Sequence, residues 1–268
     1  MTEQLGGGVF LALIALPALL GFSGCATTKT DYPTPSVVLL ESGDLIWPRP
    51  PGAFIPYRSQ LGQATGNEAA EWEQEKAQYL AELTTKRRLT RIEQERVRLL
   101  QTMNYARFAQ LYFAPIPSGQ PSPRGSFVYV GHVGIILVEG GSPFVVEAVA
   151  DQGHAVRKIS YARWLAQHRH DQFWMRRLQE RSPEKRSAIA QVALSYLGRP
   201  YNFWNFDLKD DRCFYCSKLA WLAIYKAVHY PPDDNDNGDR VLWYSPRQLI
   251  HSPHLEPVFD SGNYAATR

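Results

Sequence analysis

The chain has 268 residues, of which 44% are hydrophobic and 21% charged, a composition typical of a globular protein with a sizeable core. Its formal net charge is only +3, so the charge balance gives no reason to expect a nucleic-acid partner. The aromatic share of 12% fits either a packed core or a groove for a carbohydrate or lipid.

The first 25 residues differ from the rest of the chain. Residues 5–24 carry no charge, and their apolar stretch is short and interrupted by Pro17, which is typical of a signal peptide rather than of a spanning helix. The residues FSG before Cys25 resemble the site at which bacterial lipoproteins are cut and acylated. This resemblance implies a signal peptide over 1–24 and a lipidated Cys25. An uncleaved membrane anchor is the alternative.

Two further segments precede the main body of the predicted fold. Residues 25–42 are interpreted as a tether that ends in a short strand, and a proline-rich stretch follows GDLIW at 43–47. From Glu68 to about Phe113, apolar residues recur at helical spacing among Glu, Lys and Arg. A capping-box pattern, TRIE at 90–93, marks the start of a second helix. We therefore predict a helical-hairpin insertion over 68–113, with its charged residues on a solvated face.

The next part of the chain is rich in β-strand signals. The segments FVYVGHVGIILV (127–138), FVVEAV (144–149) and AVRKIS (155–160) are separated by turns and predict an antiparallel β-meander or barrel. A short helix, YARWLAQH, and a strand, QFWMRRL (172–178), follow. Ser182 and Pro183 begin another helix, which is expected to end at Gly198. The predicted fold class is α+β.

Two cysteines three positions apart stand at the start of an apolar helix. Cys213 lies in a loop, whereas Cys216 falls in the first turn of a helix predicted from Tyr215 to Val228. Helix N-termini favour the thiolate form of cysteine, which is the nucleophilic form. A cysteine hydrolase also needs an imidazole and a group that orients it. His132, between two glycines, and Glu147, the lone charge in an apolar strand, are the candidates, because a hairpin would bring them close together.

Other readings of these residues remain open at this point. Each member has a structural explanation: a small buried cysteine, a packed histidine, a strand glutamate facing solvent. CxxC at a helix start is also the thioredoxin arrangement, although the preceding segment lacks the alternating strand–helix pattern of that fold. A zinc site using Cys213 and Cys216 lacks a second closely spaced ligand pair. A non-catalytic binding or scaffolding lipoprotein is the third alternative.

The order of several short motifs resembles one enzyme family. GDLIW (43–47), GHVGIILV (131–138), VVEAV (145–149), FWMRRL (173–178), PYN (200–202), FYCSKLAW (214–221) and SPRQLI (245–250) follow the order found in the circularly permuted, papain-like cysteine hydrolases of the NlpC superfamily, YaeF/YiiX group. Several members of that group are lipoproteins. The resemblance implies a permuted papain-like fold, in which the β-structure packs against the helix that carries the nucleophilic cysteine.

The resemblance also implies roles for individual residues. Cys216 corresponds to the nucleophile, His132 to the general base and then acid, and Glu147 to the orienting carboxylate. Tyr201 and Tyr215 are further candidates to line the site or assist the oxyanion, together with the backbone N–H of Cys216. The family has an acid where this chain has Lys218, which we expect to face away from Cys216 and to change surface contacts alone.

The resulting prediction is a membrane-anchored cysteine hydrolase of the amidase or peptidase type. Residues 43–260 would form the hydrolase domain and 261–268 a C-terminal tail. The lipid on Cys25 would hold the protein at the outer membrane, facing the periplasm, as implied by Ala26. Cell-wall peptides are one substrate class and acyl lipids, as in the related branch that includes lecithin:retinol acyltransferase, are the other. No metal or organic cofactor and no nucleic acid are implied. In an oxidising compartment, Cys213 is a candidate redox partner of Cys216.

Overall fold

The structure is a computed structural model that describes residues 32–49, 67–112, 131–150, 153 and 155–261. The predicted signal peptide, Cys25, the first part of the tether, the start of the 127–138 segment and most of the C-terminal tail lie outside these residues. Within the described ranges, no helix has the length and apolar character needed to cross a bilayer.

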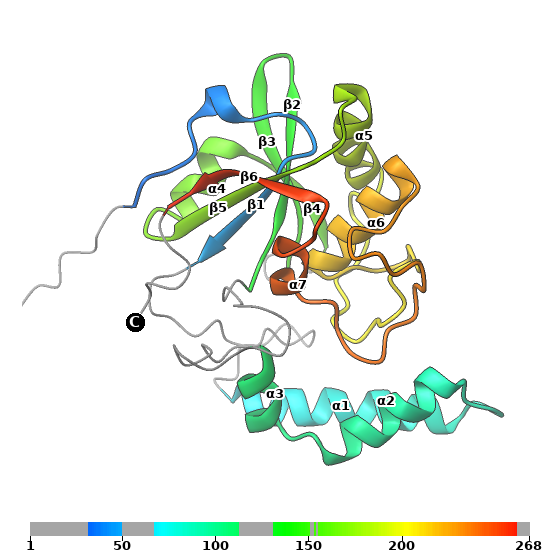
Figure 1. The fold of residues 1–268 in the computed structure, drawn as a ribbon. Coiled ribbons are helices and arrows are strands. Elements are labelled where there is room, and N and C mark those ends of the chain that lie inside the picture. Colours follow the sequence, from blue (N-terminus) through cyan, green and yellow to red (C-terminus); the bar gives the residue numbers. More distant parts are fainter. Residues whose placement is uncertain (1–31, 50–66, 113–130, 151–152, 154, 262–268) are drawn as a thin grey trace, which may run out of the picture. The chain divides into compact units, whose positions relative to one another are not determined.

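A six-stranded antiparallel sheet forms the centre of the described fold (Figure 1). Its strands are β1 (Leu45–Arg49), β2 (Gly134–Glu139), β3 (Ser142–Ala148), β4 (Val156–Ser160), β5 (Gln172–Leu178) and β6 (Leu255–Asp260), in the order β4-β3-β2-β1-β5-β6. The predicted meander is therefore confirmed for β2, β3 and β4. β4 and β6 stand at the two ends of this order, so the pairing among the described strands does not close a barrel.

The helices of the described chain are α1 (Glu68–Thr84), α2 (Arg91–Thr102), α3 (Tyr105–Tyr112), α4 (Tyr161–Gln167), α5 (Pro183–Leu194), α6 (Cys216–Val228) and α7 (Pro246–Ile250), with a 3₁₀ turn, η1, at Val37–Leu39. Helices α5 and α6 pack on one face of the sheet and α4 on the other. Alternate strand residues belong to two cores, because side chains of a strand point to opposite faces. Ile135 and Val146 pack with α5 and α6, whereas Ile136 and Val145 pack with Trp164 of α4. The α+β class is confirmed.

Several local predictions agree with the structure, and others need correction. Ser182 caps α5 and Pro183 is its first residue, as predicted, but α5 ends at Leu194 and the chain then turns to Gly198, whose φ is +79°. The expected short strand in the tether is instead the 3₁₀ turn η1. β2 begins only at Gly134, so His132 precedes the strand rather than standing within it.

The predicted helical hairpin contains a third helix. The capping box at Thr90 and Glu93 is present at the start of α2, as predicted. However, α2 ends at Thr102 because Asn104 interrupts it: the Asn104 side chain accepts a hydrogen bond from the backbone N–H of Arg107 at 2.9 Å, which caps α3. Asparagine competes with the helical backbone in this way, and a single helix to residue 113 was therefore the wrong prediction.

The charged face of these helices is not wholly solvated, which corrects a second prediction. Arg96 of α2 is buried, and its guanidinium binds the Asp239 carboxylate at 2.5 Å and donates to the Val241 carbonyl at 3.1 Å. Aromatic rings add to this contact, because Trp72 of α1 lies 5.7 Å from Trp204, centre to centre. The helical segment is thus attached to the 200–241 region by both polar and aromatic contacts.

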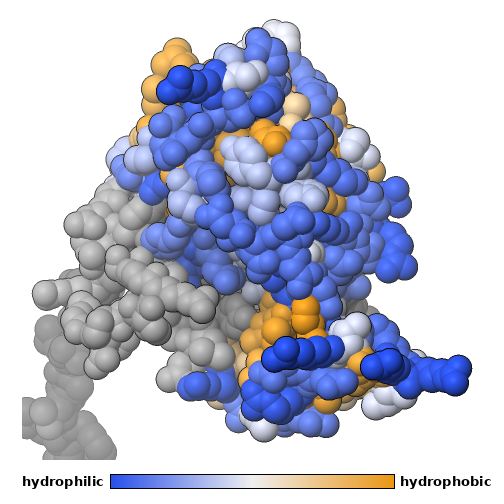
Figure 2. Space-filling model, turned by 45° about the vertical axis from the view of Figure 1, so that its right-hand side comes forward, coloured by the Kyte–Doolittle hydropathy of each residue, from blue (hydrophilic) through white to orange (hydrophobic). Residues whose placement is uncertain are grey.

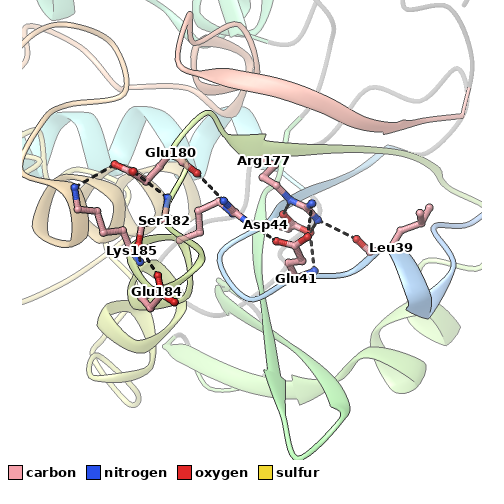
Figure 3. A network of polar contacts seen from close by, with 9 residues as sticks. Leu39, Glu41, Asp44, Arg177, Glu180, Ser182, Glu184 and Lys185 are labelled. Atoms are coloured by element: carbon pink, nitrogen blue, oxygen red, sulfur yellow. Dashed lines mark hydrogen bonds and ion pairs between the residues drawn. The ribbon is translucent and has the colours of Figure 1, made fainter.

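A network of ion pairs fixes the segment that leads into β1 (Figure 3). Arg177 of β5 binds both carboxylate oxygens of buried Asp44, at 2.7 and 2.9 Å, and donates to the Leu39 carbonyl at 3.0 Å. Glu41 accepts from Arg177 and from Arg186 of α5, at 2.5 and 2.7 Å. Gly43 is required here, since its φ is +95° and a Cβ would lie 2.0 Å from the Arg186 carbonyl oxygen. The network therefore joins residues 39–44 to β5 and α5.

Candidate active site

Cys216 is the first residue of α6, as the sequence predicted. Tyr215 before it is extended (φ −111°, ψ 167°), so the helix begins at Cys216, in whose turn the backbone N–H groups have no acceptor within the helix. The helix forms here because its sequence is apolar over most of its length, and it packs against α5 and against β2 and β3 of the sheet. The Cys216 side chain is 8% exposed, and its sulfur lies 4.0 Å from the carbonyl oxygen of Gly131.

His132 reaches the site from the residues just before β2. Gly134 allows this part of β2 to lie close to β3, because a Cβ at Gly134 would come within 2.4 Å of Val145 Cγ1. The imidazole Nε2 lies 2.7 Å from Glu147 Oε2. The Cys216 side chain also acts on the ring, since it is among the groups that raise the pKa of His132. Since Nε2 faces the carboxylate, Nδ1 is the ring nitrogen available to the sulfur. The structure thus brings Cys216, His132 and Glu147 together.

Glu147 is held by donors from three other elements. It stands on β3, is 1% exposed and faces the α4 side of the sheet. Besides His132, it accepts from Trp164 Nε1 at 2.9 Å and from Arg157 Nε and Nη2 at 2.9 and 2.7 Å. These four hydrogen bonds fix the position of the carboxylate and offset the free-energy cost of burying its charge.

Sequence reasoning missed Arg157 and Trp164. The sequence did contain a signal for Arg157. If the predicted meander continues from β3 to β4, the pairing of these two strands places Arg157 directly opposite Glu147. Trp164 gave no comparable signal, since its contact with Glu147 depends on how α4 packs against the sheet.

The charges of the site stabilise one another. Burial opposes the charged imidazole, but hydrogen bonds to Cys216 and Glu147, together with the charge of Glu147, outweigh it and raise the pKa of His132 from 6.5 to about 10. Burial likewise opposes the carboxylate, but His132, the charge of Arg157 and the Trp164 hydrogen bond lower the pKa of Glu147 from 4.5 to about 2. Near neutral pH the site therefore holds an imidazolium beside a carboxylate. This imidazolium, 22% exposed, is also placed to pair with an ionised sulfur.

The two candidate tyrosines lie in different surroundings. Tyr215 is buried at the N-cap of α6, and its hydroxyl accepts a hydrogen bond from the backbone N–H of Tyr244 at 3.2 Å. Tyr201 pairs with Phe214 in a short parallel bridge and lines a separate cavity of 860 Å³, together with Cys213. Within the described part of the chain, the walls of this cavity do not include Cys216, His132 or Glu147.

Cys213 and Cys216 are both free thiols with different neighbours. The Cys213 sulfur accepts a hydrogen bond from Asn205 Nδ2 at 2.9 Å, on the side of the cavity. The chain between the two cysteines is extended at Tyr215 and bridged to another segment at Phe214. Three extended residues span about 10 Å, whereas a disulfide needs Cα atoms within about 7 Å. A bridge between them would therefore require the backbone of 214–215 to change, and the redox pairing stays a prediction.

Lys218 is not at the surface, which corrects the expectation for this position. Its side chain is 0% exposed, in the first turn of α6, and Nζ lies 5.6 Å from the centre of the Phe214 ring. Burial lowers the pKa of Lys218 to about 8, although nearby acidic groups, Cys213 first among them, act in the opposite direction. The helix is apolar on nearly all sides, so a side chain that points away from Cys216 still enters the interior.

No group of three or more His, Cys, Asp or Glu side chains in the described ranges is arranged to hold a metal ion. His168 pairs with Asp171 at 2.7 Å. The lipidation candidate Cys25 lies outside the described residues.

Comparisons with known proteins point to one family. Residues 114–258, more than half of the chain, match the family described as "Permuted papain-like amidase enzyme, YaeF/YiiX, C92 family". The uncharacterised protein YiiX of Escherichia coli K12 is 33% identical over 98 residues, which are 36% of this chain and 46% of that protein. The crystal structure of metalloprotein YiiX from Escherichia coli O157:H7 aligns with a TM-score of 0.45 and 17% identity, over 82% of this chain and 97% of that one.

Proposed function

Because the chain belongs to the permuted papain-like amidases of the YaeF/YiiX, C92 family, we propose that it is a cysteine amidase or peptidase with a Cys216–His132–Glu147 triad. The observation that carries the proposal is the site itself. A thiol at a helix start, an imidazole and a buried carboxylate come together from three separate parts of the chain; His132 is hydrogen-bonded to Glu147, and Cys216 is among the groups that raise its pKa. A packing role alone would not require this arrangement.

In the proposed mechanism, the resting enzyme has a Cys216 thiolate, and the His132 imidazole carries the proton that the thiol has lost. The Cys216 sulfur attacks the carbonyl carbon of an amide, and the oxyanion forms near the first N–H groups of α6. His132 then gives its proton to the leaving nitrogen as the C–N bond breaks, which leaves a thioester on Cys216. A water molecule, deprotonated by His132, attacks the thioester and releases the carboxylic acid. Glu147 keeps the imidazole oriented and balances its charge in each step.

The proposal also covers where the enzyme is anchored and what it cleaves. Lipidation of Cys25 would tether the enzyme to the outer membrane on the periplasmic side, within reach of cell-wall peptides, and more than one acyl chain would make that anchoring stable. Amides of such peptides are the proposed substrates. Both statements rest on the sequence around Cys25 and on the amidase family.

The test uses steady-state turnover, which a merely reactive thiol does not give. Peptidyl p-nitrophenyl esters would be assayed with the wild-type chain, Cys216→Ser and Cys213→Ser, and acyl-enzyme would be mapped by mass spectrometry. We expect turnover in the wild type and in Cys213→Ser, and its loss with Cys216→Ser. The variant His132→Ala lacks the general base, so its turnover rate should fall by about 100-fold or more.

A panel of cell-wall stem peptides and phospholipids would then identify the substrate class. Release of an amine from peptides supports the amidase proposal, whereas release of fatty acid alone would assign the site to acyl lipids instead. Turnover that persists in Cys216→Ser, or wild-type protein that is inert towards every ester and amide, would contradict an enzyme built on this triad and favour a binding lipoprotein.

A further inference from the structure

Three consecutive apolar side chains stand exposed on the 3₁₀ turn η1 (blue in Figure 1). Val37, Val38 and Leu39 are 54%, 89% and 41% exposed. Among the described residues, Leu197 is the one other large hydrophobic side chain in the exposed class, and it stands alone in the sequence. Figure 2 shows a face that is mostly hydrophilic, with apolar surface confined to a few patches. Single exposed apolar residues are ordinary, whereas a contiguous group indicates a contact surface.

Contacts on both sides of this apolar turn, residues 37–39, hold it in place. Before it, the Pro35 carbonyl accepts a hydrogen bond from the Tyr161 hydroxyl at 2.9 Å. After it, Leu40 is buried in the core on the α4 side of the sheet. The Leu39 carbonyl itself accepts from Arg177 at 3.0 Å. The backbone of the turn is therefore fixed, and its apolar side chains are presented to the outside.

The charged groups at the base of the apolar turn balance one another. Arg177 pairs with Glu41 and with Asp44, and Arg186 pairs with Glu41. Two cations thus face two carboxylates, which leaves no charge of one sign to attract a partner of the other. The partner that fits the turn is therefore an apolar one.

The place of the turn in the chain indicates which apolar partner is near. Val37 follows Cys25, the proposed lipidation site, by twelve residues. Because twelve residues span at most about 43 Å, the turn stays within that distance of the acyl chains. A tether of this kind raises the effective concentration of the membrane at the turn, so that even a weak apolar contact can form.

From this arrangement we propose that the apolar turn inserts into the phospholipid surface to which Cys25 is anchored. The inference rests on the lipidation of Cys25 in the proposed function and not on the triad. It adds a second point of attachment, and two points restrict how the described fold rotates against the membrane, whereas a single tether does not. A protein partner or a second copy of the chain is the competing occupant of the turn.

The experiment measures how deeply single positions enter a vesicle. The full chain is produced with its leader in a Gram-negative bacterium, so that Cys25 can be acylated, and Cys213 and Cys216 are changed to serine. Either Val38→Cys or Thr34→Cys then carries a nitrobenzoxadiazole fluorophore. The vesicles contain phosphatidylethanolamine, phosphatidylglycerol and a phospholipid with a doxyl quencher on its acyl chain. Flotation and the mass of the Cys25 peptide measure the anchoring.

Thr34 is the matched control for position 38. It is also exposed and lies closer to Cys25 along the chain, but it is not part of the apolar turn. A fluorophore that reports the tether alone would therefore be quenched at position 34 at least as strongly as at position 38. We expect quenching at position 38 to be about threefold or more stronger than at position 34.

Two acidic substitutions test whether the apolar side chains cause the insertion. Val37→Asp/Leu39→Asp, added to the Val38→Cys chain, should reduce the quenching to the level at position 34, because a carboxylate is costly among acyl chains. Both side chains are exposed, so the fold should be kept, which circular dichroism would verify.

Three results would overturn the inference. If Cys25 is acylated and position 38 is quenched no more than position 34, the anchor stands but the turn belongs to a second copy or a protein partner. Quenching that the two acidic substitutions leave unchanged would show that the apolar side chains do not cause it. An unacylated Cys25 with no protein on the vesicles would remove the anchor as well. Turnover of the peptidyl esters tests the triad separately in every case.

Discussion

Glu147 illustrates how single residues determine the site. Its carboxylate is buried yet keeps its charge, because Arg157, Trp164 and His132 supply donors to both oxygens. The sequence predicted Glu147 and His132, since a lone acid in an apolar strand and a histidine between glycines are conspicuous. It did not predict Arg157, whose place opposite Glu147 is a matter of strand register, or the burial of Lys218, which depends on everything packed around α6.

The pH dependence of stability follows from Glu147 and His132. Folding lowers the pKa of Glu147. Its contribution to the free energy of unfolding is therefore complete above about pH 4.5 and is lost as the pH falls towards about 2. The pKa of His132 is raised, so its contribution is complete below about pH 6.5 and is lost as the pH rises through about 10. Glu147→Gln should cost about 3–5 kcal/mol at pH 6, because it leaves the His132 and Arg157 charges without their partner.

Urea unfolding at pH 3, 6 and 9 would measure this effect. The matched control is Glu139→Gln on β2, whose carboxylate is 39% exposed and pairs with Lys158; it should change the free energy of unfolding by less than about 1 kcal/mol. Equal losses in the two variants would contradict a special role for the buried carboxylate.

Arg157 is expected to act on the proposed reaction by fixing Glu147. Arg157→Met should reduce the turnover of the peptidyl ester by about tenfold or more, with a larger effect on kcat than on KM, because a carboxylate that is free to move no longer holds the imidazole. Arg157→Lys should restore part of the activity. Lys158→Met, the next residue, should have little effect, and an equally large loss there would indicate general damage to β4.

At the scale of whole elements, most local signals predicted the structure correctly, whereas the pairings of distant segments were not predicted. The capping residues Thr90 and Ser182 and the start of α6 were predicted correctly, because each depends on a few neighbours in the chain. The place of β1 between β2 and β5 and the existence of β6 were not predicted, since their partners lie far away in the sequence. The break before α3 was missed because a single side chain, Asn104, decides it.

The Arg177 network should hold β1 in place between its neighbours. Arg177→Met would leave Asp44, which is 1% exposed, as a buried carboxylate without its ion pair, and should reduce the free energy of unfolding by about 3–5 kcal/mol. Lys185→Met, at an exposed pair with Glu180, should change it by less than about 0.5 kcal/mol.

Denaturant midpoints of both variants would provide the measurement. The double variant Arg177→Met/Asp44→Asn should recover part of the loss, because the unpaired charge is gone. If it recovers nothing, the damage comes from lost packing of the arginine stem and the electrostatic explanation is wrong.

At the scale of the molecule, the described part of the chain from residue 32 onwards consists of a sheet with helices on both faces and of a helical segment, α1 to α3, that is attached to it through a few contacts. The sequence predicted that α1 and α2 form an insertion, and the structure adds what attaches it: Arg96 with Asp239, and the rings of Trp72 and Trp204. These contacts could not be predicted, because a charged residue on a helix is usually solvated.

Arg96 should therefore govern how firmly the helical segment is attached. Arg96→Met should reduce the free energy of unfolding by about 2–3 kcal/mol, because it removes charge-assisted hydrogen bonds that are nearly buried. Limited proteolysis would show faster cleavage around residues 84–91 than in the wild type. Arg98→Met is the control on the same helix, because Arg98 is 66% exposed and pairs only locally with Glu95. Similar cleavage of the two variants would contradict this role for Arg96.

The position of β1 has a consequence for the order of folding. Among the described strands β1 comes first along the polypeptide, yet both of its edges are paired, with β2 and with β5, at sequence separations of about ninety and about one hundred and thirty residues. The β2–β4 meander can assemble from close neighbours, whereas β5 and β6 are themselves about eighty residues apart. Both pairings of β1 are complete only when the chain extends past residue 178, so we expect β1 to join the sheet late in folding rather than to nucleate it.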